Sequence, residues 1–206
     1  MQPESARPSN WNLPNALTTL RILLVPLFGW LLLRMDGEDV TSRWWAAGVF
    51  IAAIATDRID GDIARARNLV TDFGKLMDPI ADKALTGMAF IGLSIIGELW
   101  WWVTILVLAR EWGITVMRFF MIRYGVMAAS RGGKIKTALQ AFALSGMIMP
   151  LKQLTGSWES VGEALWWVAA IAMGAAFIVT MVTGVDYVRD AIRLRREGRA
   201  ATGSAS

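Results

Sequence analysis

The stretch LTTLRILLVPLFGWLLLRM, residues 17–35, decides the fold class of this chain. It is apolar except for a few threonine and arginine side chains, and its length is close to the roughly 20 residues that a helix needs to cross a bilayer. Comparable runs recur along the sequence, so that 55% of its 206 residues are hydrophobic and 18% are charged. A soluble domain carries nearer about a quarter charged residues. We therefore predict an all-α integral membrane protein.

The apolar runs separate into six predicted membrane helices with short connections. Turn-forming sequences mark these connections, for example MDGED at residues 35–39. The predicted helices cover Asn15–Met35, Trp44–Ala66, Met77–Ile96, Leu99–Arg123, Ile135–Pro150 and Glu163–Val188. The chain then has three parts, which are an N-terminal segment at 1–14, a membrane domain at 15–188, and a basic and then disordered tail at 189–206.

The basic residues predict how the helices are oriented. Thirteen of the 21 Lys and Arg residues fall in segments on the side of the two termini, whereas two, Arg43 and Lys152, fall on the opposite side. Because positively charged loops stay in the cytoplasm, both termini are predicted to be cytoplasmic and the protein to lie in the inner (cytoplasmic) membrane of the cell. The first 15 residues lack the pattern of a signal peptide, so we expect the first apolar run to be retained.

The chain contains no cysteine and no histidine. This composition excludes disulfides, thiol nucleophiles, imidazole bases and Cys/His metal sites. Any catalysis must use carboxylates, Lys, Arg, hydroxyls or hard metal ions. The basic residues follow the membrane topology, so no nucleic-acid partner is predicted.

Charged residues stand where the second predicted helix ends and the third begins, although a membrane segment normally excludes charge. These two stretches read ATDRIDGDIARA (residues 55–66) and FGKLMDPIADKAL (residues 73–85). Helical spacing places acidic residues of each stretch on one face. The four carboxylates on these faces are those of Asp57, Asp60, Asp78 and Asp82. Because the two helices are antiparallel neighbours, the carboxylates are predicted to converge near the cytoplasmic surface.

Converging carboxylates favour a bound cation, and an all-oxygen ligand set suits Mg²⁺, Mn²⁺ or Ca²⁺. Arg65, one turn beyond Asp60, is placed to meet phosphate oxygens, so the pattern indicates chemistry on a phosphate ester or anhydride. Structural interpretations remain open for single residues. Asp78 precedes a proline and could cap its helix, and Asp57 could pair with Arg21 or Arg58.

The spacing Asp57-x2-Asp60-Gly61-x2-Ala64-Arg65-x8-Gly74-x3-Asp78-x3-Asp82 resembles the signature of the CDP-alcohol phosphotransferase family, with every fixed position present. The resemblance implies that one divalent ion is held by Asp57, Asp60 and Asp78, and a second by Asp57, Asp78 and Asp82. It implies two Mg²⁺ (or Mn²⁺) ions, Asp82 as the general base, and a homodimer. The residues implied to contact the CDP part of the donor are Gly61, Arg65 and Thr71, assisted by Asn15 and Thr18.

Three further segments resemble those members of the family that make phosphatidylglycerol phosphate. They are NLPNALTTLRILLVPLF at 12–28, ARE at 109–111 and ASRGGKIKTALQ at 129–140. The implied reaction moves the phosphatidyl group of CDP-diacylglycerol, a membrane lipid, onto sn-glycerol 3-phosphate, with the active site facing the cytoplasm. An acceptor that carries a phosphate needs a cationic pocket, for which the candidates are Arg110, Arg118, Lys134 and Lys136.

Three alternatives remain open from the sequence. The same chemistry could use another acceptor, such as inositol 1-phosphate, serine or a second phosphatidylglycerol. A cation-coupled transporter could use intramembrane carboxylates, although we find no internal repeat of the kind common in transporters. A scaffold protein would carry the carboxylates for stability alone.

Overall fold

The computed structural model describes residues 12–66, 69, 71–121 and 131–203, and within these ranges the chain is helical and contains no strand. Its α-helices are α1 (Leu13–Leu33), α2 (Val40–Ala66), α3 (Asp72–Ile95), α4 (Trp101–Met121), α5 (Arg131–Ile148) and α6 (Glu159–Gly203). Short 3-10 helices occupy Arg34–Gly37, Leu151–Gln153 and Gly156–Trp158. The predicted all-α class and the six helices are confirmed for the described ranges.

Helices α1 and α3 begin earlier than the apolar runs predicted, because polar residues cap them. The side chain of Asn12 accepts a hydrogen bond from the amide of Asn15 at 2.9 Å, and Thr71 Oγ1 accepts one from the amide of Gly74 at 3.1 Å. Such caps satisfy amides that have no partner in the first helical turn. The alternative in which Asp78 caps the third helix is wrong, since this residue lies inside α3.

Helix α6 extends well beyond its predicted end. It was expected to end at Val188, with a disordered stretch after the basic residues, but it continues as one helix to Gly203. The residues after Val188 are rich in Arg and Ala, which have high helix propensity, and contain no proline. The prediction of disorder is therefore wrong as far as Gly203.

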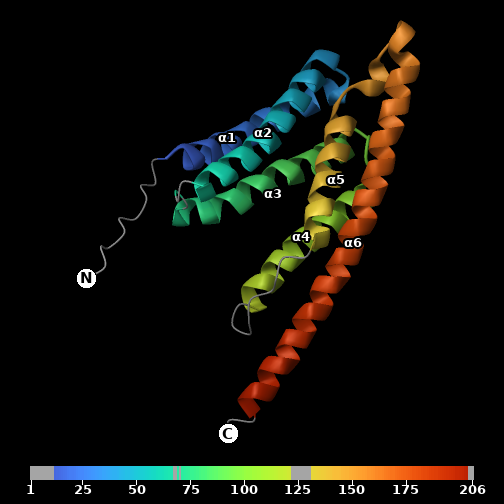
Figure 1. The fold of residues 1–206 in the computed structure, drawn as a ribbon. Helices are drawn as coiled ribbons and strands as arrows, with labels where there is room; N and C mark the ends of the chain where they lie inside the picture. Colours follow the sequence, from blue (N-terminus) through green and yellow to red (C-terminus); the bar gives the residue numbers. More distant parts are fainter. Residues whose placement is uncertain (1–11, 67–68, 70, 122–130, 204–206) are drawn as a thin grey trace.

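The helices form two groups that pack side by side, with α1, α2 and α3 in one and α4, α5 and α6 in the other (Figure 1). In the N-terminal helix group, α1 packs against both α2 and α3. In the C-terminal helix group, α5 and α6 form the most extensive pair, and α4 also packs against α6. Contacts of α5 with α2 and α3, and of α4 with α3, join the two groups. Residues from α2, α3, α4 and α5 can therefore face one another across the junction.

The apolar core fills one half of this junction. Phe28 of α1 and Phe50 of α2 are fully buried with ring centroids 5.4 Å apart. Phe90 of α3 and Leu144 of α5 belong to the same cluster. In a bilayer, such side chains stabilise the contact between helices mainly through van der Waals packing. The core fixes the groups against each other and leaves the start of α5 and the first half of α3 for polar contacts.

A polar cluster closes the end of the molecule where α2 starts and α5 ends. Arg43 is nearly fully buried, and its Nε and Nη2 donate to the carbonyl oxygens of Ile148 and Met147 at 3.0 and 2.7 Å. Its Nη1 lies 3.4 Å from Glu98, which also pairs with Lys152 at 3.0 Å. We call Arg43, Glu98 and Lys152 the Glu98 cluster. It binds the last carbonyls of α5 to the start of α2.

The outer faces of the helices are apolar. On α6, for example, Ile171 is 70% exposed and Ile178 is 62% exposed. Exposed apolar surface of this extent indicates contact with a membrane or a partner. By length and composition, two segments of the described residues are able to cross a membrane, Leu13–Gly37 and Gly156–Leu194. The integral membrane prediction is thus supported by two candidate spans.

Candidate active site

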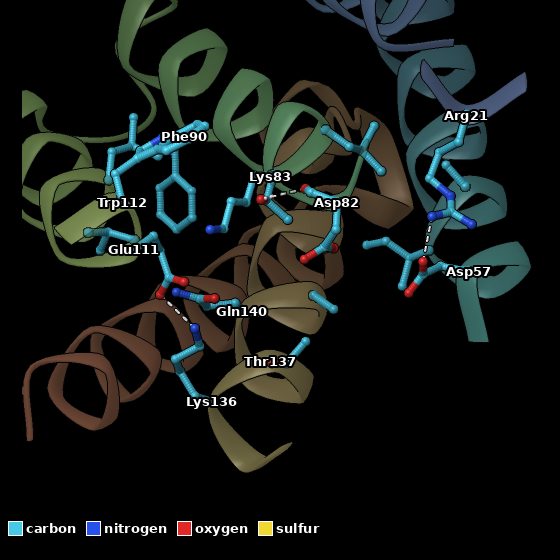
Figure 2. A pocket seen from close by; sticks show the side chains of 17 residues that line it. Arg21, Asp57, Asp82, Lys83, Phe90, Glu111, Trp112, Lys136, Thr137 and Gln140 are labelled. Atoms are coloured by element: carbon cyan, nitrogen blue, oxygen red, sulfur yellow. Dashed lines mark hydrogen bonds and ion pairs between the residues drawn. The ribbon is translucent and has the colours of Figure 1, made fainter. Parts of the chain in front are cut away.

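A cavity opens where the two helix groups meet, and Figure 2 shows the side chains that line it. Helices α1, α2 and α3 supply one part of its wall, and α4 and α5 supply the rest. Its polar and charged lining residues are Arg21, Asp57, Asp82, Lys83, Thr86, Glu111, Lys136, Thr137 and Gln140. The cavity therefore joins two carboxylates of the predicted site with one cation that was predicted to bind the acceptor.

Asp57 of α2 pairs with Arg21 of α1. Arg21 Nη1 donates to Asp57 Oδ1, and the Arg21 side chain is 2% exposed whereas that of Asp57 is 40% exposed. A buried arginine needs an anionic partner, so the pairing that the sequence left open is present. Asp57 still has a second carboxylate oxygen. The ion pair orients this residue and leaves it able to contribute an oxygen to the cavity.

A second polar group joins α1 to the start of α3. Thr18 Oγ1 donates to Asp78 Oδ1 at 2.6 Å, and Asn15 Nδ2 donates to Thr71 Oγ1 at 2.8 Å. A Cβ atom at Gly74 would lie 2.9 Å from Asn15 Oδ1, so a larger residue would push this side chain away. The structure thus brings three residues predicted for the nucleotide next to one of the signature carboxylates.

The donor set of the signature fits a hard divalent cation in its chemistry. Asp57 and Asp82 line one cavity from α2 and α3, and Asp78 lies one turn before Asp82 on α3. Carboxylate oxygens are the ligands that Mg²⁺ and Mn²⁺ prefer. Within the described side chains, no group of three acidic residues is close enough to hold an ion. Asp60 is the fourth carboxylate of the set, and its side chain lies outside the described part.

The opposite wall of the cavity carries an ionic chain from α5 to α4. Lys136 Nζ donates to Glu111 Oε1 at 2.6 Å, and Arg110 Nη1 donates to the same oxygen at 2.9 Å. Figure 2 shows Glu111 and Lys136 facing each other at the side of the cavity away from Asp57. Lys136 lines the cavity, and its role in binding the acceptor stays a prediction. Arg110 does not line it, because its guanidinium turns toward α6 and donates to Thr183 Oγ1 at 2.8 Å.

Other predicted residues fall outside what the structure describes. The side chains of Asp60 and Arg65 in α2, of Arg118 in α4 and of Lys134 in α5 are in this group. Gly61 lies in α2 and is partly exposed. Their assigned roles stay predictions.

Arg21 and Glu111 are among the cavity residues that were not predicted for the site. The sequence indicated Arg21 only as a partner of Asp57, although a charge inside an apolar run is itself a signal of function. Glu111 entered only as part of the ARE segment. Its position in the middle of α4, after the apolar-rich residues 101–109, carries the same signal.

The helical fold and the apolar outer faces are typical of a membrane-associated protein. Its cavity, lined by carboxylates and lysine, suits a charged ligand. A family model described as CDP-alcohol phosphatidyltransferase matches residues 11–185. The chain belongs to this family of transferases, which the spacing of its aspartates had indicated.

Its relatives carry names that specify a substrate. The chain is 46% identical over 182 residues to a "Probable phosphatidylglycerophosphate synthase" of Mycobacterium tuberculosis (strain ATCC 25618 / H37Rv), covering 88% of this chain and 82% of the relative. It is 39% identical over 183 residues to a "CDP-diacylglycerol--glycerol-3-phosphate 3-phosphatidyltransferase" of Rickettsia felis (86% and 94% covered). A protein of the same name from Bacillus subtilis (strain 168) is 35% identical over 190 residues (86% and 93% covered).

Proposed function

We propose that this protein transfers the phosphatidyl group of CDP-diacylglycerol to sn-glycerol 3-phosphate, giving phosphatidylglycerol phosphate and CMP. The names of the relatives supply the two substrates. The observation that carries the proposal is the cavity in which Asp57 and Asp82 of the N-terminal helix group lie across from Lys136 of the C-terminal helix group. One wall offers carboxylates that would hold divalent cations for the pyrophosphate, and the other offers a cation for an acceptor that carries a phosphate.

Asp82 is the proposed general base. It lies on the cavity wall from α3, where it can take the proton of the primary hydroxyl of the acceptor. The hydroxyl oxygen then bonds to the phosphorus that carries diacylglycerol, and the bond from that phosphorus to the oxygen of CMP breaks. CMP leaves with the electron pair of this bond. Positioning and electrostatic stabilisation supply most of the lowering of the barrier in such transfers.

The signature carboxylates Asp57, Asp60, Asp78 and Asp82 would hold two divalent cations, Mg²⁺ or Mn²⁺. When bound, such ions neutralise the charge that develops on the pyrophosphate and on the leaving CMP. Arg21 fixes Asp57, and Thr18 fixes Asp78, so two of these carboxylates have an orientation before any ligand binds. This preorganisation supports their proposed role.

The CDP part of the donor would bind near the start of α3. Asn15, Thr18 and Thr71 already form a hydrogen-bonded group there, close to Gly74. Gly61 and Arg65 are proposed to complete this nucleotide site. Arg118 and Lys134 are proposed to assist Lys136 at the acceptor phosphate.

We further propose that all six α-helices span the membrane, with both termini and the cavity on the cytoplasmic side of the cell membrane. The excess of Lys and Arg beside the termini supports this orientation. The diacylglycerol chains would then remain in the bilayer beside the apolar helix faces. The exposed apolar surface also supports a homodimer, because a second copy would cover part of it.

The test is CMP release by the purified protein in detergent with CDP-diacylglycerol and Mg²⁺. Acceptors are added one at a time, with sn-glycerol 3-phosphate, inositol 1-phosphate and serine as the panel. The proposal expects turnover with sn-glycerol 3-phosphate alone, and its loss on adding a chelator. Turnover with inositol 1-phosphate only would reject the proposed acceptor, and no turnover by folded protein with any alcohol would reject the reaction.

A further inference from the structure

Glu111 lies between two cations that face different parts of the molecule. Its Oε1 accepts from Lys136 Nζ at 2.6 Å on the cavity side and from Arg110 Nη1 at 2.9 Å on the other. All three side chains are at least three-quarters buried, with exposures of 25% for Glu111, 11% for Lys136 and 12% for Arg110. Charge-assisted hydrogen bonds in such surroundings are about twice as strong as neutral ones. The carboxylate therefore fixes the ammonium group of Lys136 in place.

Arg110 is in turn held by α6. Its Nη2 donates to Thr183 Oγ1 at 2.8 Å, and its guanidinium carbon lies 5.8 Å from the ring centroid of Tyr187. A Cβ atom at Gly184 would lie 3.1 Å from Arg110 Cγ and 3.2 Å from its Nε, so the glycine gives this side chain room against the α6 backbone. A chain of contacts thus runs from Thr183 of α6 through Arg110 and Glu111 to the cavity.

We infer that Glu111 is a positioning residue for the acceptor: it holds Lys136 so that the lysine meets the phosphate of the alcohol substrate, and α6 sets its place through Arg110 and Thr183. The inference rests on the proposed function and adds residues to it that touch no substrate. It also assigns a purpose to Arg110, which the sequence placed in the acceptor pocket and the structure turns away from the cavity.

The geometry favours positioning over competition with the phosphate. A lysine ammonium has three N–H donors, and one of them reaches Glu111, so the group can keep this bond and still donate to a phosphate oxygen. Glu111 is restrained on its far side by Arg110, whose own anchors lie on α6. A carboxylate restrained in this way keeps its hydrogen bond to Lys136 when the phosphate of the acceptor binds.

The test compares three variants of the full-length protein in steady-state CMP release, with KM measured separately for each substrate. Glu111→Ala is expected to raise KM for sn-glycerol 3-phosphate about tenfold or more, since about 1.4 kcal/mol corresponds to a factor of ten. KM for CDP-diacylglycerol is expected to stay within about twofold. Glu111→Gln keeps an oxygen that accepts from Lys136 and should recover part of the loss. Thr183→Val, which leaves Glu111 in place, should raise the same KM by a smaller factor.

Glu98→Gln is the matched control, because Glu98 also bridges two cations, Arg43 and Lys152, but lines no part of this cavity. It should change neither KM. Equal changes of both KM values in the Glu111 variants, or none, would overturn the positioning role. A lower KM for sn-glycerol 3-phosphate would show that Glu111 competes with the phosphate, which also overturns it. Absence of turnover in the wild-type protein would reject the proposed function itself, and the inference with it.

Discussion

Two glutamates each bridge a pair of cations: Glu98, which precedes the start of α4, and Glu111, which lies in the middle of α4. Glu98 pairs with Arg43 and Lys152, and Glu111 pairs with Arg110 and Lys136. The difference lies in where the remaining donors go. Arg43 donates its other N–H groups to backbone carbonyls of α5, whereas Lys136 lies on the wall of a cavity that Asp57 and Asp82 also line.

The same ionic chemistry therefore serves two purposes. In the Glu98 cluster, the arginine satisfies carbonyl oxygens at the end of a helix, which have no partner within that helix. The cluster stabilises the packing of α2 on α5. At Glu111, a cation keeps donors available beside two carboxylates of the family signature. Substitutions in the Glu98 cluster should change stability, and those around Glu111 should change kinetics.

The largest effect is expected from Asp82→Asn, which removes the proposed base from the cavity. General acid–base catalysis contributes about 10²–10⁴-fold, so kcat for CMP release should fall by at least that range. The midpoint of thermal unfolding should stay near the wild-type value. A variant that keeps more than about a tenth of wild-type kcat would remove Asp82 from the role of base.

In the Glu98 cluster, Arg43→Ala should lower the stability of the fold. Removing one partner of a buried ion pair costs about 3–5 kcal/mol, and carbonyl oxygens of Met147 and Ile148 would lose their donors as well. The measurement is thermal unfolding in detergent, with kinetics on the folded fraction. Unchanged stability, or a selective rise in one KM, would contradict a stabilising role for the Glu98 cluster that is distinct from the role of Glu111.

Lys136→Ala should weaken binding of the acceptor without affecting the donor. A hydrogen bond to a charged group contributes about 1.5–3 kcal/mol, which corresponds to a rise of roughly 10- to 100-fold in KM for sn-glycerol 3-phosphate. Lys152→Ala, at the Glu98 cluster, is the control for loss of a lysine. An equal rise in KM for CDP-diacylglycerol would remove Lys136 from the acceptor site.

The smallest effect is expected from Gly74→Ala. Its new Cβ atom would stand 2.9 Å from Asn15 Oδ1 and would displace this side chain from Thr71. We expect KM for CDP-diacylglycerol to rise about threefold to tenfold, as for the loss of one hydrogen bond of about 1 kcal/mol. Gly87→Ala is the control, since a Cβ there meets only Leu108 at 3.8 Å. Equal kinetics in the two variants would argue against a nucleotide site beside Asn15.

The sequence predicted the helical class, and it predicted that Asp57 and Asp82 face a common site, because both depend on local spacing. Apolar runs of helix length and aspartates three or four residues apart carry this information within one segment. The role of the four carboxylates in holding cations stays a prediction. The family resemblance assigned Asn15, Thr18 and Thr71 to one nucleotide site. The structure brings these three residues together near Asp78.

What the sequence could not predict depends on contacts between distant segments. Arg110 was assigned to the acceptor because its spacing from Arg118 places both on one face of the same helix. Thr183, 73 residues away in the sequence, instead binds Arg110 against α6. The role of Glu111 as a bridge likewise needs α5 beside α4. The ends of α6 were missed because an apolar pattern marks the membrane part of a helix and says nothing of its polar continuation.

The most direct test measures CMP release in three preparations side by side: the wild-type protein, Asp82→Asn and Glu98→Gln, each with CDP-diacylglycerol, Mg²⁺ and sn-glycerol 3-phosphate. We expect turnover that depends on sn-glycerol 3-phosphate in the wild-type protein and, at a similar rate, in folded Glu98→Gln, and we expect its loss in folded Asp82→Asn. Turnover by Asp82→Asn at the wild-type rate, or loss of turnover in folded Glu98→Gln, would contradict the assignment of catalysis to the cavity between the two helix groups.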